Sequence, residues 1–155
     1  MTKIQQQMQQ LSAHLFLNNQ WIKSRGEQYP IIDPATEATI AHYADAQADE
    51  VELAVKNANA AQKIWAQYSA LERADALHEV ARKLQEYAAD VGECLTREMG
   101  KPFREAEWEG GASASSFRYY AELARHDQGR VSGPAIAGQW QMTIKEPLGT
   151  VVSIV

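Results

Sequence analysis

The sequence contains a single cysteine, Cys94, among its 155 residues. A disulfide needs two cysteines, so the class of small proteins held together by internal disulfides is excluded. No hydrophobic run approaches the ~18 apolar residues that cross a bilayer. The first ten residues are rich in glutamine and lack the basic and apolar stretches of a secretory signal. We therefore expect a cytoplasmic protein with no membrane partner.

Positive charge is scarce as well, because 15 Lys and Arg face 20 Asp and Glu and give a formal net charge of -5. Without a basic cluster, the chain has no electrostatic footprint for a phosphate backbone, so we expect no nucleic-acid partner. Nine glycines and five prolines are too few for a low-complexity linker, and 45% hydrophobic residues argue against general disorder. The length suits one folded domain or part of a larger one.

Familiar catalytic and metal-binding motifs are also missing. The segment Gly133–Gly138 has the glycine spacing of a phosphate loop, but Gln139 and Trp140 follow it in place of Lys-Ser or Lys-Thr, so we predict a turn between strands. Cys94 has no histidine within one helical turn, so we interpret it as a core residue and not as a nucleophile. The histidines form no i, i+4 pair and predict no metal centre; they are His14, His42, His78 and His126.

Local signals predict a polar tail at residues 1–14 and order after it. Two apolar runs within Leu15–Ile22 flank Asn18 and Asn19, which tolerate positive φ and predict a tight hairpin. In the segment 29–36, two prolines forbid a helix and predict an extended connector with a short strand.

Helical periodicity dominates from residue 49 to residue 125. Four helices are predicted, over residues 49–65, 69–88, 90–99 and 105–125. Asp49 with Glu52, and Ser69 with Glu72, have the spacing of capping boxes. Gly100 is placed to end the third helix. Small residues around Gly110 and Gly111 weaken the fourth helix intrinsically, so we expect another element to pack closely against it.

The period changes to that of strands after residue 129. Trp140, Met142 and Ile144 alternate with polar residues and predict a strand with one apolar face. The run Thr150–Val155 is continuously apolar or β-branched, as in a strand that is covered on both faces. Such a strand needs neighbours that the chain does not supply, so we expect an incomplete fold.

Taken together, several motifs in this order resemble the N-terminal third of the NAD(P)-dependent aldehyde dehydrogenase superfamily. They are Leu17-Asn-Asn-Gln-Trp21, Asp33-Pro-Ala-Thr36, Thr96-Arg-Glu-Met-Gly-Lys-Pro102, Phe117-Arg-Tyr-Tyr-Ala121 and Lys145-Glu-Pro-Leu-Gly-Thr-Val-Val152. The resemblance implies an α/β fold: an incomplete cofactor domain, mainly helical, with an N-terminal hairpin, an oligomerisation-arm strand and one inner parallel-sheet strand. Residues 15–126 would form the helical part, 127–146 the arm and 147–155 the truncated inner strand.

The resemblance also implies the chemistry of the parent enzyme. In the family, a cysteine thiolate attacks the aldehyde, hydride passes to NAD or NADP, and a glutamate-activated water releases the carboxylic acid. The family positions of the nucleophile, the base, the oxyanion asparagine and the cofactor ligands would follow Val155, and Cys94 does not match the nucleophile. We therefore expect no catalytic or cofactor-binding residue in this chain, no tight binding of NAD or NADP, and no activity from the chain alone.

Two further expectations follow from the resemblance. A structural sodium or potassium ion would be held by backbone oxygen of Ile31 and Ile32 and by the side chain of Glu98. The arm, residues 129–146, would pair with a second copy or with a full-length family member. One alternative stays open, in which the chain is a truncated, non-catalytic paralogue that acts as an interaction module. The aldehyde and the choice between NAD and NADP stay undecided.

Overall fold

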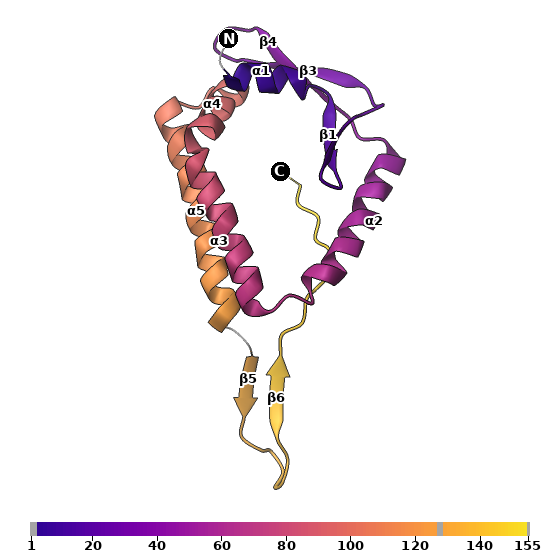
Figure 1. Cartoon of the computed structure of the whole chain (residues 1–155), viewed down its shortest axis with the longest axis vertical. Helices are drawn as coiled ribbons and strands as arrows, with labels where there is room; N and C mark the ends of the chain where they lie inside the picture. Colours follow the sequence, from indigo (N-terminus) through magenta and orange to yellow (C-terminus); the bar gives the residue numbers. More distant parts are fainter. Residues whose placement is uncertain (1–2, 127–128, 155) are drawn as a thin grey trace.

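A computed structural model describes residues 3–126 and 129–154. Five helices and three two-stranded antiparallel sheets occur in this part of the chain. Their order is α1 (Lys3–Gln10), β1 (His14–Leu17), β2 (Gln20–Lys23), β3 (Gln28–Ile32), β4 (Thr39–Ala44), α2 (Ala48–Trp65), α3 (Ala70–Glu86), α4 (Ala88–Met99), α5 (Phe103–His126), β5 (Gly129–Ser132) and β6 (Gln141–Ile144). Figure 1 shows α3, α4 and α5 along one side and α2 along the other, with β5 and β6 projecting from one end.

The predicted hairpin is present as β1 and β2. Asn18 and Asn19 have φ values of 49° and 61°, and Leu17 pairs with Gln20 across the two-residue turn. Positive φ at both central residues is the turn geometry that matches the twist of paired strands. The rings of Phe16 and Trp21 lie 4.9 Å apart on this hairpin.

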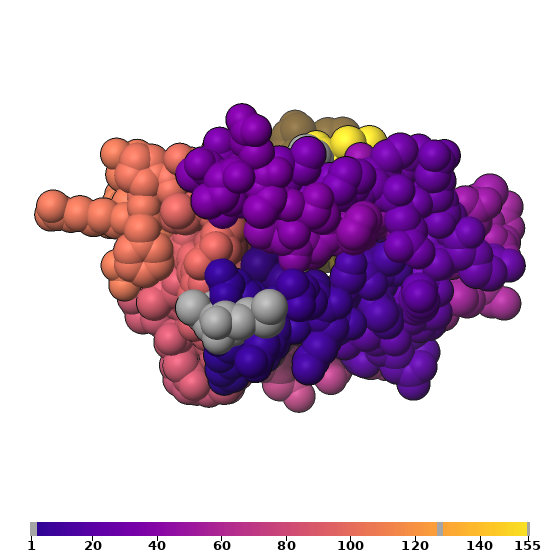
Figure 2. Space-filling view, turned by 90° about the horizontal axis from the view of Figure 1, so that it is seen from above, coloured from indigo at the N-terminus to yellow at the C-terminus, as the bar shows by residue number. Residues whose placement is uncertain are grey.

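The expected polar tail is instead largely helical. Residues 3–10 form α1, in which Ile4 is buried and Met8 is half-buried. Helix α1 contacts both β4 and α4, and the N–H of Ala13 donates to the carbonyl oxygen of His42 at 2.8 Å. Seen from above in Figure 2, α1 (indigo) lies beside the β3 and β4 pair (purple). Burial of apolar side chains one turn apart stabilises this helix, although most of its sequence is glutamine.

Strand β4 was not predicted, because the connector was expected to hold only one strand. It pairs antiparallel with β3, and the rings of Tyr29 and Tyr43 stack at 5.3 Å across the pair. The register shifts between Ile31 and Ile32, which pair with Ala41 and Thr39 respectively and pass over Ile40. This is a bulge, which leaves one residue outside the ladder.

Helix α2 begins slightly earlier than predicted, with Gln47 as its N-cap. The expected partner, Glu52, is exposed, and the carboxylate that accepts the capping hydrogen bond belongs to Glu50. Glu50 is only 8% exposed and accepts from the N–H of Gln47 at 2.7 Å, from the hydroxyl of Ser24 at 3.0 Å and from the N–H of Arg25 at 3.3 Å. One carboxylate thus caps α2 and ties it to the segment that follows β2.

These contacts make the fold sensitive to acid at Glu50. The hydrogen bond from the Gln47 backbone, followed by those from Ser24 and Arg25, lowers the pKa of Glu50 below its ordinary 4.5. A lowered folded pKa contributes stability that is complete above the unfolded value and is lost as the pH falls through the folded value. We expect Glu50→Gln to remove this part of the acid sensitivity in urea unfolding between about pH 6 and pH 3. The exposed Glu52→Gln is the matched control, and equal acid sensitivity in both variants would contradict the assignment.

The predicted start of α3 and end of α4 are confirmed. The Ser69 hydroxyl accepts from the N–H of Glu72 at 3.2 Å, while the Glu72 carboxylate accepts from the N–H of Ser69 at 2.8 Å. Gly100 ends α4 in the left-handed conformation, with φ at 76°. Both ends therefore follow from local hydrogen bonding.

Helix α5 packs against α3 and α4 through small residues, which confirms the predicted close approach. We call this contact the helix seam; its buried residues are Ala74, Ala81, Ala88, Gly92, Ala106, Gly110, Ala114 and Ala121. A methyl group added to Gly110 would lie 3.2 Å from the carbonyl oxygen of Ala88. No large side chain in the described segments is fully buried. Alanine and glycine thus set the spacing between these helices.

The segment 150–154, expected to be the inner strand, is paired with no other strand of the described residues. Val151 and Ile154 are 76% and 92% exposed. A strand is defined by hydrogen bonds to a neighbour, and the described segments supply no neighbour there. The fold class itself holds in broader form, as an incomplete mixture of helices and small antiparallel sheets. Val155, and residues 127–128 of the expected arm, lie outside the described residues.

Candidate functional site

The residues expected to hold a cation come from two elements that meet in the structure. Ile31 and Ile32 lie on β3, Glu98 lies near the end of α4, and β3 contacts α4. The turn after β3 packs on the end of α4 so closely that a methyl group added to Gly100 would lie 2.9 Å from Cγ of Pro34. We call this contact the β3–α4 junction.

An ion pair crosses the same junction. Oδ2 of Asp33 lies 3.8 Å from Nη1 of Arg97, and Asp33 is 6% exposed. The other carboxylate oxygen of Asp33 accepts from the N–H of Ala35 at 2.9 Å, which shapes the turn. Asp33 directly follows Ile32, and Arg97 directly precedes Glu98. The residues that join β3 to α4 are therefore the immediate neighbours of the expected cation ligands.

The expected cation ligands of this junction are two backbone oxygens and one carboxylate. The register shift between Ile31 and Ile32 leaves Ile40 of β4 unpaired, so the extra residue of the bulge lies on β4 and not among these ligands. Glu98 is exposed and offers carboxylate oxygen, and oxygen ligands are those that hard cations prefer. Within residues 3–126 and 129–154, no group of three or more His, Cys, Asp or Glu side chains could hold a metal ion.

Thr96 is a buried polar residue near this junction. Its hydroxyl oxygen is buried and has no hydrogen-bond partner. Side chains two residues apart on a helix do not face each other, so Thr96 and Glu98 cannot ligate one ion together. We therefore leave Thr96 out of the candidate ligand set.

Cys94 lies in surroundings that disfavour a thiolate. The side chain is half-buried on α4, and burial, followed by the negative charges of Glu98, Glu93 and Asp90, raises the pKa of the thiol above its ordinary value. A reactive cysteine needs a lowered pKa, from a nearby cation or a helix N-terminus. Burial and the three neighbouring negative charges therefore oppose thiolate formation at Cys94.

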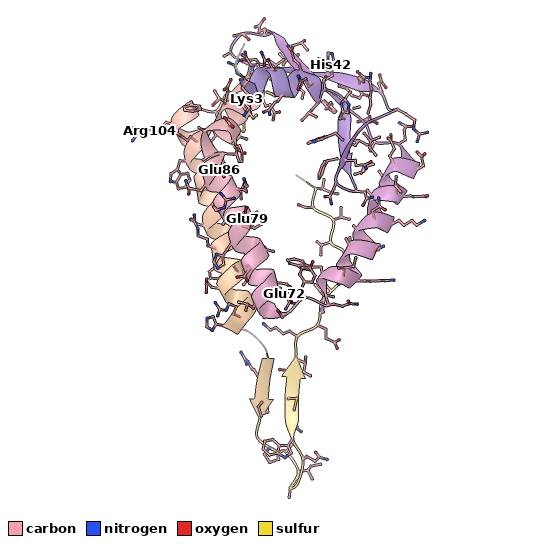
Figure 3. The ribbon with its side chains drawn as sticks, viewed as in Figure 1. Lys3, His42, Glu72, Glu79, Glu86 and Arg104 are labelled. Atoms are coloured by element: carbon pink, nitrogen blue, oxygen red, sulfur yellow. The ribbon has the colours of Figure 1, made fainter. Side chains whose placement is uncertain are left out.

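Three carboxylates of α3 are engaged in structural contacts. Figure 3 shows Glu72, Glu79 and Glu86 following one another along the helix. Arg82 pairs with Glu79 at 2.6 Å and with Glu86 at 3.0 Å, and its hydrogen bond lowers the pKa of Glu79. Glu72 caps the same helix. The lowered pKa of Glu72, from its hydrogen bonds with Ser69, and the lowered pKa of Glu79 make these two carboxyl groups poor general acids near neutral pH.

Two features of the described residues that could suggest a phosphate site have other roles. Residues 45–47 lead from β4 into α2 without a glycine, and the carboxylate of Glu50 already occupies that helix N-terminus. The glycine pair at 133 and 138 lies between β5 and β6, where methyl groups added to either residue would meet open space. This confirms a turn between strands.

The strands β5 and β6 form an isolated hairpin with a large apolar face. Val131 pairs directly with Met142, and residues two apart on a strand share a face. Val131, Trp140, Met142 and Ile144 are 71%, 85%, 62% and 72% exposed. A two-stranded ribbon with an uncovered apolar face is marginally stable by itself and is suited to contact another chain.

Sequence reasoning missed Asp33, Arg97 and Glu50 as organising residues. The only signal for the first two was their position beside Ile32 and Glu98. For Glu50, the spacing Gln47-x-x-Glu50 was present but competed with Asp49-x-x-Glu52.

In the described stretches, every helix is too short or too polar to cross a bilayer.

Comparisons with known proteins point to one family. A family model described as "Aldehyde dehydrogenase family" matches residues 21–155. An α-ketoglutaric semialdehyde dehydrogenase of Bacillus subtilis is 32% identical over 88% of this chain and 28% of its own length. A peroxisomal aminoaldehyde dehydrogenase of Malus domestica is 34% identical over 90% of this chain and 30% of its own.

A solved structure shares the fold. The betaine aldehyde dehydrogenase of Staphylococcus aureus, in complex with NAD+, superposes with a TM-score of 0.83 and 23% identity, over 93% of this chain and 29% of that one. The chain thus spans less than a third of the length of these relatives.

Proposed function

The chain belongs to the aldehyde dehydrogenase family, and on this premise we propose that it supplies the N-terminal portion of an NAD(P)-dependent enzyme that oxidises an aldehyde to a carboxylic acid. The match over residues 21–155 carries this proposal. The superposition, with a TM-score of 0.83 over 93% of the chain, supports the proposal at the level of the fold. When bound, the cofactor accepts hydride, and no residue of this chain is assigned to that step.

The role of this chain in the enzyme is to build a frame. The helix seam gives a rigid outer wall, the β3–α4 junction offers a place for a structural sodium or potassium ion at Ile31, Ile32 and Glu98, and the arm at 129–146 offers a surface for a second subunit. The arm proposal rests on the four exposed apolar residues of its one face. We propose the cytoplasm as the location of the parent enzyme.

We expect the purified chain to oxidise no aldehyde, because Cys94 is its only cysteine and lacks an activating group. The test mixes the chain with short aliphatic, aromatic and amino aldehydes, with NAD or NADP, and follows cofactor reduction by fluorescence. Co-expression with a family enzyme from which the corresponding N-terminal portion has been deleted should restore turnover. A Cys94→Ser variant should restore it equally well. Reduction by the chain alone that disappears in Cys94→Ser would contradict the proposal.

The second candidate is a non-catalytic interaction module that pairs with a full-length family member. It rests on the same exposed face of β5 and β6. The two candidates differ in complementation: a module co-purifies with an intact family enzyme but restores no activity to one lacking its N-terminal portion.

A further inference from the structure

Residues 150–154 have a strand-forming sequence but are paired with no other strand of the described residues. Thr150, Val151, Val152 and Ile154 are β-branched, and the segment contains neither a charged residue nor a proline. Val151, Val152 and Ile154 are 76%, 71% and 92% exposed. A segment of this composition with free edges is a template on which another strand can pair.

The same segment borders an apolar groove on α2. Thr150, Val151 and Val152 line a cavity of about 390 Å³ together with residues of α2 and β1, and Thr150 also lines a second cavity of about 520 Å³ on α2. Figure 1 shows the segment (yellow) passing α2 and ending between α2 and the side formed by α3 and α5. The α2 side of the two cavities is mainly apolar and includes Val51, Ala54, Val55, Ala58, Ala61 and Trp65.

The chain leaves much more of its surface uncovered than a compact monomer does. Its accessible surface is 11718 Å², whereas a compact monomer of 17.3 kDa exposes about 7,800 Å². The excess of about 3,900 Å² is several times the ~800 Å² that each partner buries in a standard dimer interface. The uncovered surface is therefore large enough for a stable dimer.

We propose that residues 150–154 of two copies of this chain pair antiparallel and join the copies as a two-fold dimer. Each copy presents the same segment, and antiparallel pairing of identical segments is self-complementary, so the contact closes at two chains. Pairing centred on Val152 places Thr150 opposite Ile154, and β-branched cross-strand pairs stabilise a sheet. Residues 145–149 connect β6 to the segment, so this contact is continuous with the exposed apolar face of the arm. The inference goes beyond the proposed function, because it concerns how copies of this chain associate and not the reaction of the parent enzyme.

Proline substitutions test the pairing. Neighbouring N–H groups of a strand point to opposite edges, so either Val151→Pro or Val152→Pro removes a hydrogen bond at the paired edge, whichever edge that is. We expect that variant to raise the dissociation constant of the dimer about tenfold or more in sedimentation equilibrium, with unchanged circular dichroism of the monomer. Two control variants should stay within about threefold of the unsubstituted chain. Val152→Thr keeps the N–H and the β-branched shape, and Leu148→Pro places the same proline at a 99% exposed residue outside the segment.

Hydrogen exchange followed by mass spectrometry locates the contact. Strand pairing protects backbone N–H groups from exchange, so the amides of residues 151–154 should exchange about tenfold or more slowly at protein concentrations above the dissociation constant than below it. If the copies associate but these amides exchange equally fast at both concentrations, the contact lies elsewhere, such as on the arm, and the proposal is overturned.

The outcomes separate this inference from the proposed function. A chain that stays monomeric, or that associates equally well with either proline in place, overturns the pairing of two copies. If such a chain still restores turnover to a family enzyme that lacks its N-terminal portion, the proposed function stands and that enzyme is the partner of residues 150–154. A dimer with protected amides that restores no turnover supports the inference and counts against the proposed function.

Discussion

Gly92→Ala should lower the free energy of unfolding, although alanine is the better helix former. A methyl group at this position of α4 would lie 2.8 Å from the backbone nitrogen and 2.9 Å from Cα of Glu107 on α5. Backbone atoms cannot rotate away, so the two helices would have to separate. Overpacking of this kind costs about 1–3 kcal/mol, against which the gain in helix propensity is about 1 kcal/mol. We expect a net loss of about 2 kcal/mol, because the clash falls at the severe end of that range.

Gly111→Ala provides the matched control at a second helix contact, where α5 faces α3. The nearest atom to its added methyl group is Nε2 of Gln85 at 3.5 Å, which is an ordinary contact with a flexible side chain. This variant should gain about 0.5–1 kcal/mol from helix propensity alone. Urea unfolding followed by circular dichroism gives both values. The same sign for both variants would show that close helix contact at Gly92 does not determine stability.

Features of the fold that depend on local interactions could be predicted from the sequence. The start of α3 and the end of α4 were predictable because Ser69, Glu72 and Gly100 satisfy backbone groups within a few residues of themselves. The hairpin at Asn18 and Asn19 was predictable for the same reason. Each of these features depends on hydrogen bonds or backbone angles that are local in sequence.

Features that depend on distant partners were missed. Ile4 is buried in α1, and α1 contacts β4 and α4, which lie far from it in the sequence. Residues 150–154 were predicted as a strand from their β-branched composition, but composition cannot supply a neighbouring strand. Large side chains expected on the inner faces of the helices, such as Val51 and Leu71, are 50% and 54% exposed, since little in the described segments packs against them.

The cation ligands Ile31, Ile32 and Glu98 stay a prediction from family resemblance. The ion pair of Asp33 with Arg97 depends on how the turn after β3 meets α4, and no pattern in either segment specifies that distance. Charge and burial of Asp33 become informative only once the fold places a guanidinium beside it.

Substitutions on the two faces of β6 should have different effects on self-association through the arm. Met142 lies opposite Val131 on the apolar face, whereas the adjacent Gln141 points to the other face. If the apolar face is buried between subunits, Met142→Lys loses about 1.5–3 kcal/mol of apolar burial and adds the cost of a charge in an apolar contact. We therefore expect the dissociation constant of self-association to rise about 100-fold or more.

Gln141→Lys makes the same change of charge one residue away and should leave the dissociation constant within about threefold, since a rim or solvent-facing charge contributes little. Sedimentation equilibrium over a range of protein concentrations measures all three proteins. An equal loss in both variants would mean that the strand edge, and not the apolar face, makes the contact. If the chain stays monomeric at every concentration, the exposed apolar face does not drive association by itself. Its residues, which are 62–85% exposed, are Val131, Trp140, Met142 and Ile144. In that case the arm would need a partner that carries more of the family fold.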